Sequence, residues 1–136
     1  MIVALICVIS LAALGQIFVS YCRSALASAR KADLSERFLA VAGIESKNIP
    51  ANDFDRILEL VRLCPDYEDG RGEIRAVGVY RNLLEVLGRV SRTAMPKLAA
   101  WSEQERQSCS YFAAVVLDRC ISSSRELFVQ HASDRL

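Results

Sequence analysis

The feature that most constrains this chain is an apolar stretch near its N-terminus. Residues 2–22 carry no charged side chain, and eleven of them are Leu, Ile, Val or Phe. As a helix rising about 1.5 Å per residue, these 21 residues span roughly 31 Å. That length matches the ~30 Å hydrocarbon core of a bilayer. We therefore predict that residues 1–22 form a single transmembrane anchor.

The charges beside the stretch predict its orientation. Basic residues near a span favour the cytoplasmic side of a membrane. None precedes the stretch, whereas Arg23, Arg30 and Lys31 follow it. We therefore expect the rest of the chain in the cytoplasm. Residues 23–32 are Ala-rich and either form a juxtamembrane neck or prolong the membrane helix, and residues 33–136 form a helical domain.

A cleaved secretory signal is the alternative to an anchor. The tripeptide Ala25-Leu26-Ala27 has the small residues of a cleavage site, and cleavage there releases a secreted or periplasmic helical binding module. Three features oppose it. The stretch has no basic residues before it, it exceeds the usual 7 to 15 or so apolar residues, and Arg23 lies between it and the site.

Composition limits what the rest of the chain can do. A chain of 136 residues has room for one small domain besides the anchor. Its 17 basic and 16 acidic residues leave a net charge of +1, so no overall field favours nucleic acid. The five cysteines include no C-x-x-C pair, which favours free thiols in a reducing compartment.

The first half of the domain shows two helical patterns. Asp33-Leu34-Ser35-Glu36 is typical of a capped helix start, and that helix should run to about Val41. A turn containing Pro50 should follow, with Asn52 capping the next helix. Pro65 should end that helix. Its apolar residues recur at steps of three and four: Phe54, Ile57, Leu58, Val61 and Cys64. Residues 66–72 should form an exposed loop.

The second half should contain the core. Residues 73–90 are apolar around most of a helix, so we expect this helix to be central and packed on two sides. Pro96 suits the first turn of a short helix. Ser102 then begins a capping pattern, and the stripe of this next helix should end where Ser122, Ser123 and Ser124 interrupt it. Residues 125–136 add a final turn or two.

These patterns together predict an all-α fold. An N-terminal single transmembrane helix should be followed by a small bundle of four to five helices. No strand is expected, because the short β-branched groups lie inside helical periods.

Two sets of residues are candidates for contact with partners. Gly15 and Gln16 lie in mid-membrane, where a small residue permits close helix approach and an amide can bond a neighbouring helix. Four arginines give residues 75–92 a basic ridge for an acidic partner or anionic lipid headgroups: Arg75, Arg81, Arg89 and Arg92. Alternatively, Glu85 pairs with Arg81 and Arg89 at i, i+4 spacing and merely stabilises its own helix.

Catalytic and metal-binding patterns are weak. The only histidine, His131, lies near the C-terminus, where a surface position is expected. Cys109 and Cys120 share a helical face with apolar residues, which favours packing over a redox or metal role. Trp101 should anchor a helix junction. The spacing of the acids in the loop does not match a calcium-binding loop. These acids are Asp66, Glu68 and Asp69.

The sequence thus indicates a protein that works by contact. We expect a single-pass membrane protein that acts as an accessory or assembly subunit of a membrane complex, or as an adaptor. Membrane-protein partners or a second copy should bind it. We expect no cofactor, metal, small-molecule substrate or enzymatic activity.

Overall fold

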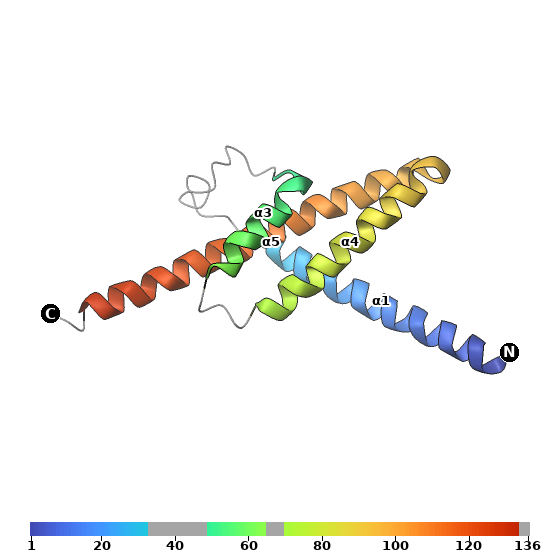
Figure 1. The fold of residues 1–136 in the computed structure, drawn as a ribbon, viewed down its shortest axis with the longest axis horizontal. Helices are drawn as coiled ribbons and strands as arrows, with labels where there is room; N and C mark the ends of the chain where they lie inside the picture. The colour runs from blue at the N-terminus through green and yellow to red at the C-terminus, as the bar shows by residue number, and fades with distance from the viewer. Residues whose placement is uncertain (33–48, 65–69, 134–136) are drawn as a thin grey trace.

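The computed structural model describes residues 1–32, 49–64 and 70–133 of the chain. In these ranges the chain forms four α-helices and one 3-10 turn, and no strand. The prediction of an all-α fold with a long apolar N-terminal helix is confirmed. Figure 1 shows a long helix at each end of the molecule, with the helices crossing near its centre. The predicted helix over residues 33–41 and the loop acids lie outside the described residues.

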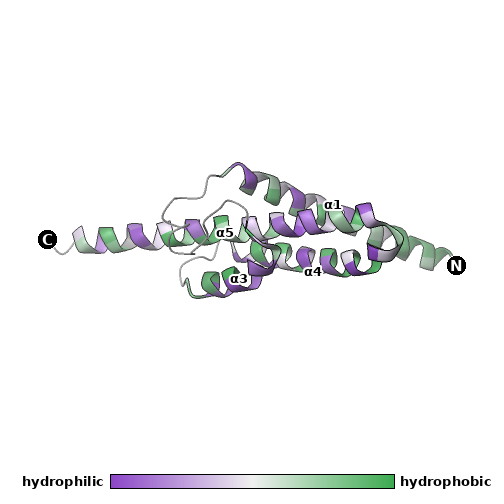
Figure 2. Ribbon diagram, turned by 90° about the horizontal axis from the view of Figure 1, so that it is seen from above, coloured by the Kyte–Doolittle hydropathy of each residue, from purple (hydrophilic) through white to green (hydrophobic). Residues whose placement is uncertain are grey.

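Helix α1, Ile2–Arg30, continues through most of residues 23–32, the segment expected either to form a neck or to prolong the membrane helix. Its first twenty residues project from the rest of the molecule and are largely exposed, although Phe18 and Val19 are partly covered. Figure 2 shows this projecting part in hydrophobic colours. Within the described ranges, α1 is the one helix long and apolar enough to cross a membrane. From Cys22 onward α1 belongs to the core, because Cys22, Leu26 and Ala29 are buried.

The next described segment is short and packs across α5. Pro50 has an extended backbone and leads into the 3-10 turn η1, Ala51–Asp53, and then helix α3, Phe54–Arg62. The predicted apolar face is confirmed at Phe54, Ile57 and Val61, which are buried. The predicted side-chain cap at Asn52 is wrong, since this residue lies inside η1 and Asp53 precedes the helix without a capping bond.

Helices α4, Arg71–Ala94, and α5, Pro96–Ser133, form a hairpin around Met95. The backbone of Met95 is not helical (φ −143°, ψ 84°), as suits a residue before proline, and Pro96 opens α5 as predicted. Two other predictions are wrong. Ser102 does not start a helix but lies within α5, where its hydroxyl donates to the Ala99 carbonyl at 2.7 Å. The three serines from Ser122 do not interrupt α5, and Ser124 donates to the Cys120 carbonyl at 3.0 Å.

The core surrounds the middle of α5. Residues 109 and 112–117 of α5 are buried there against α1, α3 and α4. From α4 come Ile74, Val77, Tyr80 and Leu84. We predicted that α4 packs on two sides. Among the described residues it packs on one side only, because its second apolar side is exposed. The last part of α5 extends away from the core to the C-terminus (Figure 1).

Candidate contact surfaces

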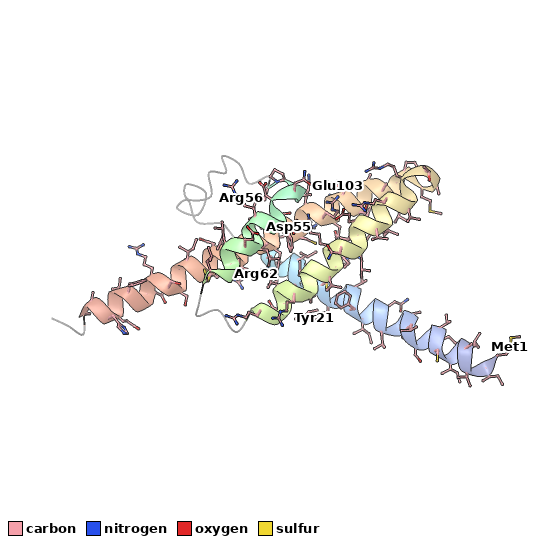
Figure 3. All side chains as sticks on the ribbon, viewed as in Figure 1. Met1, Tyr21, Asp55, Arg56, Arg62 and Glu103 are labelled. Carbon is pink, nitrogen blue, oxygen red and sulfur yellow. The ribbon has the colours of Figure 1, made fainter. Side chains whose placement is uncertain are left out.

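The junction between α1 and the domain is built around Glu105. This side chain is 9% exposed, and its carboxylate lies 3.5 Å from Arg23 Nε and 3.8 Å from Arg30 Nη2. Tyr80 of α4 donates its hydroxyl to the same carboxylate at 3.4 Å. One α5 acid therefore joins α1 and α4 just beyond the apolar part of α1. Figure 3 shows Tyr21 beside this crossing and Met1 at the far end of α1.

Further contacts hold the last turns of α1 in place. Arg30 donates to the Ser108 hydroxyl, and the Tyr111 hydroxyl donates to the Ala32 carbonyl at 2.8 Å. The thiol of Cys22 contacts the Ala76 carbonyl of α4 at 3.8 Å. The end of α1 is thus tied to both helices of the hairpin.

The role of Glu105 was missed at the sequence level. Its place three residues after Ser102 predicts an acid in the first turn of a new helix. Its spacing of four residues from Cys109 was the available signal, because that spacing puts a carboxylate on the buried face of α5. Such a carboxylate needs cationic or hydrogen-bonding partners.

Two groups near this junction hold their protons more tightly than usual. Burial raises the pKa of the Cys109 thiol from 9.0 to about 12, and the Glu105 charge adds to the shift. Burial also raises the pKa of the Tyr80 hydroxyl, again with help from Glu105. Since a thiolate is the reactive form of cysteine, Cys109 is placed as a packing residue.

The predicted membrane contact residues lie together on α1. Gly15 and Gln16 line an open groove of about 620 Å³, whose other walls are Ala12, Val19, Ser20 and Arg23. A Cβ added at Gly15 would meet no atom within 4 Å. The groove therefore offers a face of mainly small and polar side chains on a helix that is otherwise apolar.

The predicted basic ridge is only partly at the surface. Arg75, Arg89 and Arg92 are exposed, and Arg89 forms an ion pair with Glu85 of its own helix. That pair supports the local role that Glu85 suggested. Arg75 and Arg92 remain as exposed cations on two different turns of α4.

The prediction that Arg81 belongs to the exposed basic ridge is wrong. Its side chain is 8% exposed, its Nη1 lies 3.5 Å from Asp55, and its Nη2 donates to the Ala51 carbonyl at 3.3 Å. The guanidinium also lies 5.0 Å from the centre of the Phe54 ring. Arg81 therefore holds η1 and α3 against α4 and is not available to a partner.

The other singled-out residues lie as follows. Cys109 and Cys120 are buried, in agreement with the packing interpretation. His131 is exposed on the last turns of α5, and Trp101 is half-buried at the hairpin end, packed against the core. Within the described ranges no three His, Cys, Asp or Glu side chains gather into a group that could hold a metal ion.

Comparisons with protein-family models, curated proteins and solved structures find no match for this chain.

Proposed function

We propose that this protein is a single-pass membrane protein whose helical domain faces the cytoplasm and acts by contact, as an accessory or assembly subunit or as an adaptor. The observation that carries the proposal is the division of α1. Its apolar part up to Tyr21 is largely exposed, whereas Cys22, Leu26 and Ala29 are buried in the domain core. An exposed apolar helix of this length needs a bilayer around it.

The same division argues against release by cleavage near Ala27. Cleavage there removes Cys22 and Leu26 from the core. It also removes Arg23 from the Glu105 carboxylate. A signal peptide is discarded and should contribute nothing to the mature fold, so these contacts favour a retained anchor.

The groove on α1 is the proposed partner contact within the membrane. Small residues let another transmembrane helix approach closely, and the Gln16 amide can hydrogen-bond that helix. Arg75 offers an acidic partner a cation outside the membrane. Catalysis is not proposed, since Cys109, which was considered for a redox or metal role, is buried with its pKa raised to about 12.

Affinity purification of the full chain in mild detergent tests this proposal. The wild type should retain a membrane protein or a second copy in a fixed ratio. Gly15→Leu should reduce this recovery at least about five-fold by blocking close approach, while the fold is kept because position 15 is open. Ala13→Leu is the matched control, because Ala13 does not line the groove. A monomer without partners would contradict the proposal.

A further inference from the structure

One side of α4 is both apolar and exposed. Val79, Leu83, Val86 and Val90 are each more than half exposed, and their spacing of four, three and four residues puts them on one face. The core face of the same helix lies elsewhere, at Val77, Tyr80 and Leu84. We call these four exposed residues the α4 stripe.

The hairpin end continues this apolar surface. Met95 is exposed, and an open hollow of about 560 Å³ at the turn is lined almost entirely by apolar atoms of Met95, Pro96, Lys97, Leu98 and Trp101. Tryptophan at the edge of an apolar surface is typical of the membrane–water interface.

The net charge around the distal part of this surface is positive. Residues 86–102 include Arg89, Arg92 and Lys97 and no acidic residue. Glu85 neutralises Arg89, so Arg92 and Lys97 supply the net positive charge. Apolar residues flanked by exposed cations are the chemistry of helices that lie in the surface of an anionic bilayer.

The stripe begins next to the apolar surface of α1. Cys22 of α1 contacts α4 at the Ala76 carbonyl, and Val79 follows Ala76 by three residues on the same side of α4. From that crossing, the projecting part of α1 and the hairpin end both extend toward the same end of the molecule, opposite to the C-terminus (Figure 1). A bilayer spanned by α1 up to Tyr21 therefore has its surface near the hairpin.

We propose that the distal half of the α4–α5 hairpin lies in the headgroup layer of the bilayer that α1 spans. The α4 stripe and Met95 enter the top of the acyl region, and Arg92 and Lys97 contact anionic headgroups. A second copy is the less favoured occupant, because the stripe begins near the crossing with α1 and is bordered by the cations Arg92 and Lys97. This inference rests on α1 being a membrane span.

Trp101 makes the proposal measurable, because it is the only tryptophan of the chain. The full chain is reconstituted into phosphatidylcholine vesicles containing phosphatidylglycerol, with or without lipids brominated in the upper acyl chain. Interfacial helices bury their apolar face about 5–10 Å into this region, so brominated lipid should lower the Trp101 emission roughly two-fold.

A double variant and a matched control test whether the quenching depends on the α4 stripe. Val86→Asp/Val90→Asp places charges on the stripe and should remove most of the quenching. Phe128→Asp/Val129→Asp changes two exposed apolar residues at the opposite end of α5 and should leave the quenching as in the wild type. Circular dichroism checks that both variants keep their helix content.

The outcomes separate this inference from the anchor itself. A chain that stays in alkali-washed vesicles with unquenched Trp101 would overturn the inference and leave the anchor standing. Equal quenching in the wild type and both variants would also overturn it, as would cross-linking of a second copy through the stripe. A chain that washes out of the vesicles would overturn the proposed anchor, and this inference with it.

Discussion

At the scale of single residues, Glu105 links α1 to the domain. Its buried carboxylate has two arginines from α1 and a tyrosine hydroxyl from α4 as partners. Both arginines are more than half exposed, so solvent screens much of each ion pair. The stabilisation should therefore be modest per pair, and removal of the charge should be felt mainly at the junction.

Glu105→Gln keeps an acceptor for Tyr80 but removes the charge. We expect the free energy of unfolding in mild detergent to fall by about 1 kcal/mol. The control is Glu103→Gln, because Glu103 lies two residues before Glu105 on the same helix, is 56% exposed and pairs with Arg106. That control should change stability by less than about 0.5 kcal/mol. Equal losses in the two variants would contradict the role of Glu105.

The raised pKa of Cys109 predicts how the free energy of unfolding changes at alkaline pH. Its pKa is about 12 in the folded protein and 9.0 in an ordinary thiol. Below pH 9 the Cys109 thiol keeps its proton in both the folded and the unfolded state, so its contribution to stability is fully present. Between these values only the unfolded state loses the proton, so stability falls as pH rises, by up to about 1.4 kcal/mol per pH unit.

Unfolding curves at several alkaline pH values check this expectation. Cys109→Ala should show a shallower fall above pH 9 than the wild type, with a remaining slope from Tyr80, whose pKa is also raised. An unchanged slope in Cys109→Ala would show that the Cys109 proton is not linked to folding.

At the scale of elements, the packing of α4 on α5 depends on Gly88. A Cβ at this position would lie 2.8 Å from the Ser102 hydroxyl oxygen, whereas a Cβ at Gly78 would lie 3.9 Å from the Phe54 ring. The first distance is a clash and the second is ordinary contact. The two glycines of one helix therefore give a matched pair.

Gly78→Ala should stabilise the protein by about 0.5–1 kcal/mol through helix propensity. Gly88→Ala should lose that gain or destabilise, because Ser102 must rotate and break its bond to Ala99. Adding Ser102→Ala should recover the gain, with Ser102→Ala alone as the reference. Thermal unfolding followed by circular dichroism measures all four variants. Stabilisation by Gly88→Ala alone would contradict the close packing at this crossing.

The elements also show how much the sequence could predict. The apolar periods at Phe54, Ile57 and Val61 and the break at Pro96 are local signals, and they predicted α3 and the start of α5. The capping pattern at Ser102 is equally local, but it was overridden because α5 packs along α4 as one helix. Local patterns therefore found the helices better than their ends.

The candidate contact surfaces were harder to predict. A wide apolar face on α4 indicates burial but not whether protein or lipid covers it, so the exposed stripe could not be foreseen. The pairing of Arg23 with Glu105 joins residues 82 positions apart, and no local pattern encodes it. The helical position of Arg81 predicts a surface residue, but Asp55 and Ala51 from the preceding segment contact its guanidinium.

At the scale of the whole molecule, one continuous helix joins the proposed membrane span to the core. Since Cys22, Leu26 and Ala29 pack inside the domain, no flexible linker separates the two parts. A tilt of α1 in the bilayer must therefore move the hairpin and α3 with it. The proposed anchor therefore requires that residues 2–27 stay attached to the domain.

The most direct test is the intact mass of the protein recovered from cells after an alkaline wash of the membranes. We expect the uncleaved chain in the membrane pellet, with the 15.1 kDa of these 136 residues retained. N-terminal sequencing of the same sample should show that the apolar stretch is still attached. A shorter chain beginning at Ser28 in the soluble fraction would contradict the account.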